Sequence, residues 1–216
     1  MHKINFDPNT IPVNVLDVEN HQMVKLLEDN PGVLLDIRTP EEVSKGFLTN
    51  ASFINFYDEN FLQKASWIKK NQAIYVYCHA GGRSSKAAEM LIELGFREVY
   101  NLVGGYSKWL EDGYIVEKGL KNIKGPSSKS FSKEQIDGIL QTNQNVVLVF
   151  KTPWCLPCKK LDAVLDSFSK NRPNWEVVKI NMDSNKDLAE NYEVNSVPTL
   201  LFFKKSKQLS SHVGFI

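Results

Sequence analysis

The chain has 216 residues, of which 42% are hydrophobic and 24% are charged, a composition typical of soluble globular proteins with one or two domains. Its formal net charge is +1, but the charge is uneven: residues 1–116 hold 11 Lys and Arg against 15 Asp and Glu, and residues 117–216 hold 15 against 10. The basic residues are spread over half the chain without an interleaved aromatic patch, so we expect no nucleic-acid partner.

The chain has neither a secretory nor a membrane-spanning pattern. Charged residues interrupt its first twenty positions, and no apolar stretch approaches the length that crosses a bilayer. It contains three cysteines, an odd number that does not make a disulfide scaffold. We therefore expect a cytoplasmic protein, with no membrane partner, whose thiols stay reduced unless they are catalytic.

The first half alternates short apolar runs with helical or turn segments. After an irregular stretch, 1–15, Asp17 is a candidate N-cap for a helix that ends before Asn30. A last helix is expected from Tyr106 through Leu110. The alternation predicts an α/β domain, residues 1–116, with a mostly parallel sheet. Its expected strands are Val33–Ile37, Ser52–Asn55, Ala73–Tyr77 and Glu98–Asn101.

Cys78 directly follows one of these strands and precedes an amphipathic helix, for which Ser84 or Ser85 is the candidate N-cap. A thiolate there faces the unpaired N–H groups of a helix start, and Arg83 adds a positive charge, which are the surroundings that make cysteine nucleophilic. Gly81 and Gly82 let the backbone curl around the sulfur.

Three residues of this stretch also have a plainer interpretation. Cys78 can be an inert buried thiol, the default for a cysteine beside an apolar strand. Arg83 can be a surface charge, although it would then oppose the helix dipole, so we favour a role in orienting an anionic substrate. His79 is a candidate base for Cys78, but adjacent side chains diverge, so a catalytic role is not favoured.

The stretch from Cys78 to Ser85 resembles the active-site loop of the rhodanese (sulfurtransferase) family. Further motifs of that family are matched by Val33–Glu42, Gly46–Ala51 and Asn101–Trp109, with Phe47 in place of the usual histidine. A related phosphatase family has one residue more between its cysteine and arginine, so the spacing here favours a sulfur substrate. The resemblance implies a persulfide on Cys78, with substrate contacts from His79, Ala80, Gly81, Gly82 and Ser84.

Residues 117–130 are rich in Lys, Gly and Ser and are interpreted as a linker, and no later segment repeats the first domain. The second domain, residues 131–216, is expected to begin with a helix led by Ser132, and a helix is also expected to open at the cysteine pair Cys155 and Cys158. A short helix is expected near Asp187–Tyr192. Further strands are expected at Asn145–Phe150, Val177–Asn181, Leu200–Lys204 and Gln208–Val213.

The second domain resembles thioredoxin, because Trp154–Cys158 matches its redox site and Val197–Thr199 matches its cis-proline loop. At a helix start, an exposed Cys155 attacks and Cys158, one turn inside, resolves the mixed disulfide. The resemblance gives Trp154, Pro157 and Pro198 supporting roles. Half of a zinc site and a structural disulfide are the alternatives; we favour neither, and we expect no metal and no cofactor.

Three features depart from the thioredoxin pattern. Leu156 stands where the family usually has glycine, which makes the rim of the site more apolar. Val149 replaces the buried acid that commonly lies six residues before the site, so proton transfer to Cys158 loses its usual helper. We also expect the domain to lack the terminal helix that normally covers the sheet, because the sequence ends just after the last expected strand.

The two resemblances together predict a sulfurtransferase coupled to its own reductase. Cys78 takes sulfur from thiosulfate or another sulfane-sulfur donor, Arg83 and the loop stabilise the anion, and Cys155 and Cys158 then release the sulfur. The expected partners are that donor and a reducing dithiol or protein thiol acceptor. The alternatives are a thiol-disulfide oxidoreductase whose first domain recognises the client, and a sulfur-relay module that delivers sulfur to a partner protein.

Overall fold

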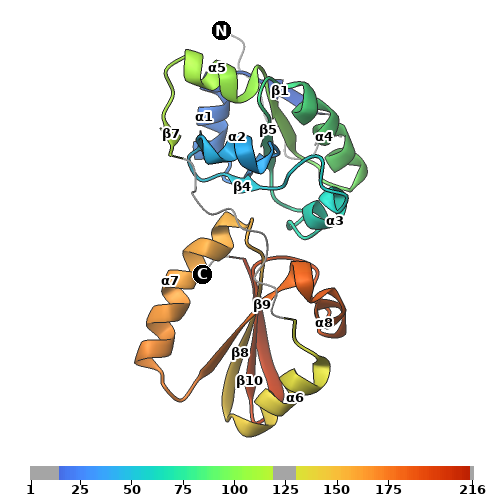
Figure 1. Cartoon of the computed structure of the whole chain (residues 1–216), viewed down its shortest axis with the longest axis vertical. Coiled ribbons are helices and arrows are strands. Elements are labelled where there is room, and N and C mark those ends of the chain that lie inside the picture. Colours follow the sequence, from blue (N-terminus) through green and yellow to red (C-terminus); the bar gives the residue numbers. More distant parts are fainter. Residues whose placement is uncertain (1–14, 119–129, 215–216) are drawn as a thin grey trace. The chain divides into compact units, whose positions relative to one another are not determined.

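The computed structural model describes residues 15–118 and 130–214 (Figure 1). The chain divides into two compact units, Met1–Asn122 and Ile123–Ile216. The irregular stretch predicted at 1–15 and the linker predicted at 117–130 lie almost wholly outside the described residues. The boundaries 1–116 and 131–216 therefore stay predictions.

The first unit is built on a five-stranded sheet in which every neighbouring pair of strands is parallel. This confirms the mostly parallel sheet expected from the alternating apolar runs. β5 lies in the middle and all four of its residues are buried, as its run of β-branched and aromatic side chains predicts. The strands, in sheet order, are β1 (Leu16–Val18), β6 (Val99–Leu102), β5 (Ile74–Tyr77), β2 (Val33–Asp36) and β4 (Ser52–Phe53).

Five helices and a two-stranded antiparallel pair complete the described part of the first unit. The pair consists of β3 (Phe47–Leu48) and β7 (Val116–Glu117). Glu117, predicted to begin the linker, therefore pairs with Phe47. The helices are α1 (Asn20–Asp29), α2 (Pro40–Ser44), α3 (Phe61–Ser66), α4 (Gly82–Glu93) and α5 (Gly105–Glu111).

The structure corrects two predicted helix starts. Asp17 does not cap α1, because it lies in β1 opposite Asn101, whose amide donates a hydrogen bond to its carboxylate; the N-cap of α1 is Glu19. α4 begins before Ser84, at Gly82, and its N-cap is Gly81 with φ +96°. Glycine adopts this left-handed conformation without steric cost, which lets the helix start immediately after the cysteine loop.

The second unit has a four-stranded mixed sheet in the order β11 (Lys207–Val213), β10 (Thr199–Lys204), β8 (Asn145–Lys151) and β9 (Glu176–Asn181). β8 pairs in parallel with β9 and antiparallel with β10. α7 covers one face of the sheet, and α6 and α8 cover the other (Figure 1). The helices are α6 (Lys133–Thr142), α7 (Leu156–Asn171), the short 3₁₀ turn η1 (Met182–Ser184) and α8 (Lys186–Asn191). The predicted Ser132 cap is confirmed.

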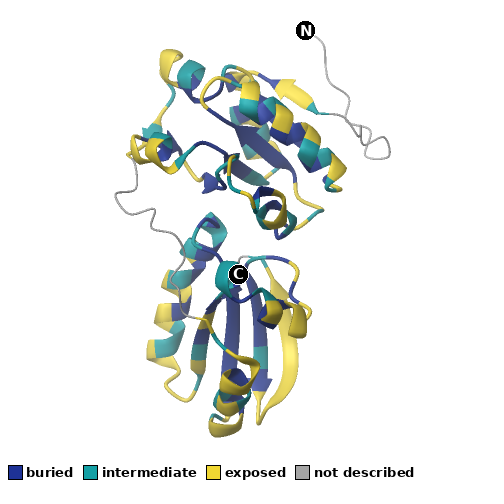
Figure 2. Ribbon diagram, turned by 45° about the vertical axis from the view of Figure 1, so that its right-hand side comes forward, coloured by how far each residue is buried: buried dark blue, intermediate teal, exposed yellow. Residues whose placement is uncertain are grey.

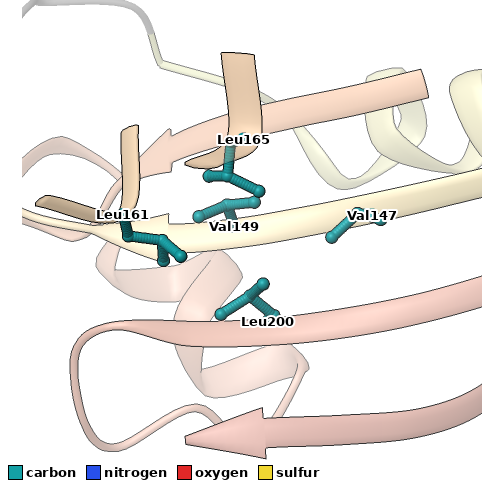
Figure 3. Close-up of a cluster of buried hydrophobic side chains, with 5 residues drawn as sticks. All are labelled: Val147, Val149, Leu161, Leu165 and Leu200. Atoms are coloured by element: carbon teal, nitrogen blue, oxygen red, sulfur yellow. The ribbon is translucent and has the colours of Figure 1, made fainter. Parts of the chain in front are cut away.

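A compact apolar cluster joins α7 to this sheet (Figure 3). Alternate residues of β8 point to one face, so Val147 and Val149 meet Leu161 and Leu165 of α7, together with Leu200 of β10. Central strands are buried, whereas β11 is exposed along its whole length (Figure 2). No helix follows β11 within the described residues, which end at position 214.

Candidate functional sites

Cys78 lies immediately after β5, where the chain turns into α4. Its side chain is 1% exposed, and its Sγ accepts hydrogen bonds from the backbone N–H of Gly81 at 3.2 Å and from the Ser84 hydroxyl at 3.5 Å. The Ser84 hydroxyl also lies 3.0 Å from the Gly81 carbonyl. Ser84 thus binds the sulfur from the first turn of α4.

The loop makes Cys78 more acidic than an ordinary thiol. Burial raises the pKa of the thiol, but hydrogen bonds from the Ser84 hydroxyl and from the backbone N–H groups of Ser84, Ala80 and Gly81 outweigh it and lower the pKa. A lower pKa increases the fraction of thiolate near neutral pH, and the thiolate is the nucleophilic form. The electrostatics therefore suit attack by Cys78 on an electrophilic sulfur.

Backbone hydrogen bonds from the first turn of α5 hold the Cys78 loop in place. The backbone N–H of Tyr106 donates to the Cys78 carbonyl at 2.9 Å, and the N–H of Ser107 donates to the His79 carbonyl at 2.9 Å. Gly105, the first residue of α5, has φ +56°, and a Cβ there would lie 2.4 Å from the Cys78 carbonyl oxygen. Only glycine permits this close approach.

Arg83 is engaged by an acidic residue that the sequence analysis did not single out. Its two terminal nitrogens donate to Glu42 at 2.8 and 2.6 Å. This bidentate bond from Arg83 lowers the pKa of Glu42 to about 2, so the carboxylate is ionised at neutral pH. Thr39 and Glu42 form the capping box of α2, a spacing that is visible in the sequence and could have drawn attention to Glu42.

The remaining predicted residues of the first site lie on its outer side. His79, Ala80 and Gly82 are exposed. The His79 ring nitrogen Nε2 lies 3.2 Å from the Ser107 hydroxyl. The loop therefore presents His79 to solvent, while its backbone surrounds the sulfur.

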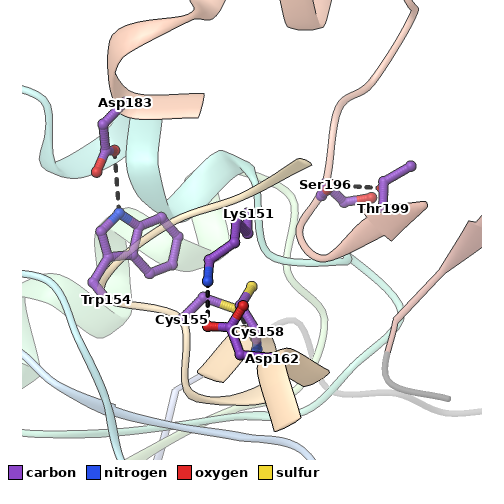
Figure 4. Close-up of a disulfide and its surroundings, with 8 residues drawn as sticks. All are labelled: Lys151, Trp154, Cys155, Cys158, Asp162, Asp183, Ser196 and Thr199. Atoms are coloured by element: carbon purple, nitrogen blue, oxygen red, sulfur yellow. Dashed lines mark hydrogen bonds and ion pairs between the residues drawn. A yellow bond between two sulfur atoms is a disulfide. The ribbon is translucent and has the colours of Figure 1, made fainter. Parts of the chain in front are cut away.

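The second site is a disulfide between Cys155 and Cys158 at the start of α7 (Figure 4). Cys155 is the N-cap of α7, and its Sγ accepts the backbone N–H of Cys158 at 3.2 Å. We expected Cys155 to be exposed, but it is only 3% exposed in this oxidised form, because the disulfide ties its sulfur back onto the first turn of the helix. Cys158 is 1% exposed.

Two of the residues predicted to support the disulfide, Trp154 and Pro157, adjoin its cysteines in the chain. Trp154 donates its indole N–H to Asp183 at 3.2 Å, and Pro157 occupies the first turn of α7, where no intrahelical N–H is lost. The Val197–Pro198 peptide bond is cis. The next residue, Thr199, donates to the Ser196 carbonyl at 2.7 Å (Figure 4).

Charged residues that the sequence analysis missed lie beside the disulfide. Lys151, the last residue of β8, forms an ion pair with Asp162 of α7 (Figure 4). Lys179 of β9 lies 3.1 Å from the other oxygen of Asp162. Asp162 follows Cys158 by four residues, a spacing that a helical reading of the sequence could have revealed.

The described parts of the chain are residues 15–118 and 130–214. They contain no group of three or more His, Cys, Asp and Glu side chains placed to hold a metal ion. None of their helices is long and apolar enough to cross a bilayer.

A parallel sheet that ends in an N–H-lined thiol, followed by a mixed sheet with a disulfide at a helix start, defines a protein of thiol redox chemistry. Comparison with known families agrees. The Rhodanese-like domain family matches residues 19–112 and the Thioredoxin family matches residues 127–215. The chain therefore belongs to the thioredoxin family through its second unit and carries a rhodanese-like domain in its first.

Individual relatives cover the second unit well. The chain is 34% identical over 85 residues to a thioredoxin of Mycoplasmoides gallisepticum, covering 39% of this chain and 85% of that protein. It is 36% identical over 86 residues to a thioredoxin of Chlamydia pneumoniae, covering 40% of this chain and 83% of the relative.

A solved structure of a rhodanese-related protein from Thermoplasma volcanium is 26% identical to this chain, with a TM-score of 0.43. The match covers 47% of this chain and 97% of the chain in that structure.

Proposed function

We propose that the protein is a sulfurtransferase in which Cys78 carries a persulfide that the Cys155–Cys158 dithiol reduces. The observation that carries the proposal is the environment of Cys78, a buried sulfur that accepts hydrogen bonds from the Gly81 backbone and the Ser84 hydroxyl. Such donors stabilise an anionic sulfur that attacks, and equally the anionic persulfide that results.

The reaction begins when the Cys78 thiolate attacks the outer sulfur of thiosulfate or another sulfane-sulfur donor. A sulfur–sulfur bond forms on Cys78, the bond within the donor breaks, and sulfite or a thiol leaves. The Cys155 thiolate then attacks the outer sulfur of this persulfide, which returns Cys78 as a thiolate and places the persulfide on Cys155. Because both cysteines belong to one chain, the effective concentration for this step is on the order of millimolar if the connection is short.

Cys158 completes the cycle by attacking the Sγ of Cys155. The Cys155–Cys158 disulfide forms and hydrosulfide leaves, so the two cysteines are oxidised and the sulfane sulfur is reduced to sulfide. An external dithiol then reduces the disulfide. A cytoplasmic location, in which such reductants are abundant, remains part of this proposal.

A second candidate is a thiol-disulfide oxidoreductase in which the rhodanese-like unit recognises the client. The ion pair of Arg83 with Glu42 favours this candidate, because it leaves less positive charge near Cys78 for an anionic sulfur donor. In that case Cys78 takes no part in turnover, and disulfide reduction by a Cys78→Ser variant proceeds at the wild-type rate.

The experiment that tests the proposal is sulfide release in a single turnover, after thiosulfate is added to the pre-reduced protein without external thiol. We expect prompt sulfide from the wild type, a persulfide that accumulates on Cys78 in Cys155→Ser, and neither in Cys78→Ser. If the wild type releases no sulfide and gains no sulfur mass, thiosulfate is not the donor, and other sulfane-sulfur donors and the oxidoreductase role take precedence.

A further inference from the structure

The charged pair Lys151 and Asp162 lies on the same side of the sheet as the disulfide. Val147, Val149 and Lys151 alternate along β8 toward α7, so the lysine emerges where the apolar cluster ends. On α7, Asp162 follows Cys158 by four residues and therefore lies on the same face, one turn further along. Figure 4 shows both side chains pointing toward each other beside the two cysteines.

The contacts of Asp162 leave one of its oxygens able to accept a proton. Lys151 Nζ donates to Oδ2, and the two side chains are only 19% and 29% exposed. Oδ1 is buried and lies 3.1 Å from Lys179 Nζ, but it accepts no hydrogen bond from the part of the chain that the structure describes. Lys179 instead directs a hydrogen bond of 2.8 Å to Asp166.

Thiol-disulfide exchange requires such an acceptor at Cys158. The resolving thiol must lose its proton before it attacks, and Cys158 is 1% exposed, which keeps bulk water from removing it. Val149, which faces α7 from β8, is apolar and cannot take the proton. On a helix, side chains four residues apart have Cβ atoms about 5–6 Å from each other, which is within reach of a carboxylate and a thiol.

We propose that Asp162 accepts the proton of the Cys158 thiol during disulfide exchange, and that Lys151 is a positioning residue that orients the Asp162 carboxylate. This inference rests on the proposed dithiol chemistry of Cys155 and Cys158, and it assigns the proton acceptor of that chemistry.

The step balances with a client disulfide as the oxidant. The Cys155 thiolate attacks one client sulfur, forming a mixed disulfide and releasing the other client sulfur as a thiolate. The Cys158 proton then moves to Asp162, the Cys158 thiolate attacks the Cys155 Sγ, and the second client sulfur leaves as a thiolate that takes the proton back. The protein loses two electrons to the client, and two thiols replace one disulfide.

Charged groups approach Asp162 from the other elements packed around it. Lys151 approaches from β8 and Lys179 from β9, and Lys179 is shared with Asp166. Lys159 lies on α7 next to Cys158; burial lowers its pKa, and the nearby charge of Lys151 lowers it further.

The test follows the resolving step in the pre-reduced full-length protein with oxidised glutathione as the probe. Samples are quenched in acid and alkylated, and the peptide that contains both Cys155 and Cys158 is analysed by mass spectrometry, which separates the glutathione mixed disulfide from the internal disulfide. The variants are Asp162→Asn, Asp162→Glu and, as the matched control, Asp166→Asn, which removes an exposed carboxylate from the next turn of α7.

At pH 7 we expect the mixed disulfide to accumulate in Asp162→Asn and to resolve at least about 100-fold more slowly than in the wild type. The deficit should close as the pH approaches 9.5, where hydroxide deprotonates the thiol. Asp162→Glu should recover part of the rate, and Asp166→Asn should match the wild type. A wild-type rate in Asp162→Asn, or a deficit of equal size at every pH, overturns the inference. A wild type that forms neither disulfide refutes the dithiol function itself, and the inference with it.

Discussion

Both terminal nitrogens of Arg83 donate hydrogen bonds to the carboxylate of Glu42. The sequence predicts that Arg83 orients an anionic substrate, but in the fold the negative charge of Glu42 offsets the positive charge of Arg83. Attraction between unit charges near a protein surface reaches about 1–4 kcal/mol, and about 1.4 kcal/mol is tenfold in affinity. We therefore expect Glu42→Gln to lower the KM for thiosulfate by roughly 3–10-fold, measured by sulfite release with an external thiol. Glu41→Gln, the same change at the exposed neighbour, is the control. An unchanged or higher KM in Glu42→Gln contradicts this explanation.

The same pair predicts a dependence of stability on pH. The bond from Arg83 lowers the pKa of Glu42 in the folded protein from its ordinary value of 4.5 to about 2. A lowered carboxyl pKa contributes stability that is complete above the unfolded pKa and is lost as the pH falls through the folded one. The stability difference between wild type and Glu42→Gln should therefore be constant above about pH 5 and shrink between pH 4.5 and 2. Hydrogen exchange in peptides of β5 reports it, and a difference that grows on acidification would refute the assignment.

Ser84 should control the reactivity of Cys78. Ser84→Ala removes the hydroxyl that donates to the thiolate, so the pKa of Cys78 should rise. A hydrogen bond of about 1 kcal/mol corresponds to a roughly fivefold slower alkylation of Cys78 at pH 7, with the difference vanishing at high pH where both thiols are ionised. The measurement is the pH profile of alkylation in the Cys78 peptide. Ser85→Ala serves as the control, and an unshifted profile in Ser84→Ala would show that the hydroxyl has no such role.

Gly105 should tolerate no side chain. Gly105→Ala places a Cβ 2.4 Å from the Cys78 carbonyl at a positive φ, so the β5–α4 loop must move and the first unit should lose roughly 2–4 kcal/mol of stability. Gly113→Ala is the matched control, because Gly113 also has a positive φ but its Cβ meets nothing within 4 Å. We expect it to cost only about 1 kcal/mol. Equal losses in the two variants, measured by hydrogen exchange in β5 and β6, would exclude the clash with Cys78.

Local patterns in the sequence were sufficient for most of the elements. The runs of apolar residues predicted β5 and β8, and Ser132 with Gln135 marked the start of α6, because these signals involve residues that are neighbours in the chain. The predicted starts of α1 and α4 were wrong because each depends on something that local patterns do not show. Asp17 is drawn into β1 by pairing with Asn101, and Gly81 takes a conformation that composition alone does not reveal.

By itself, the sequence determined the class of each half and the places of Cys78 and of the Cys155–Cys158 pair, since strand and helix periodicity puts each thiol where a strand gives way to a helix. Only the tertiary structure decided which charges act there. Glu42 reaches Arg83 across 41 positions of the chain, and Lys151 reaches Asp162 across 11. Such contacts depend on the register of strands and the packing of helices against them, and short-range periodicity carries no information about either.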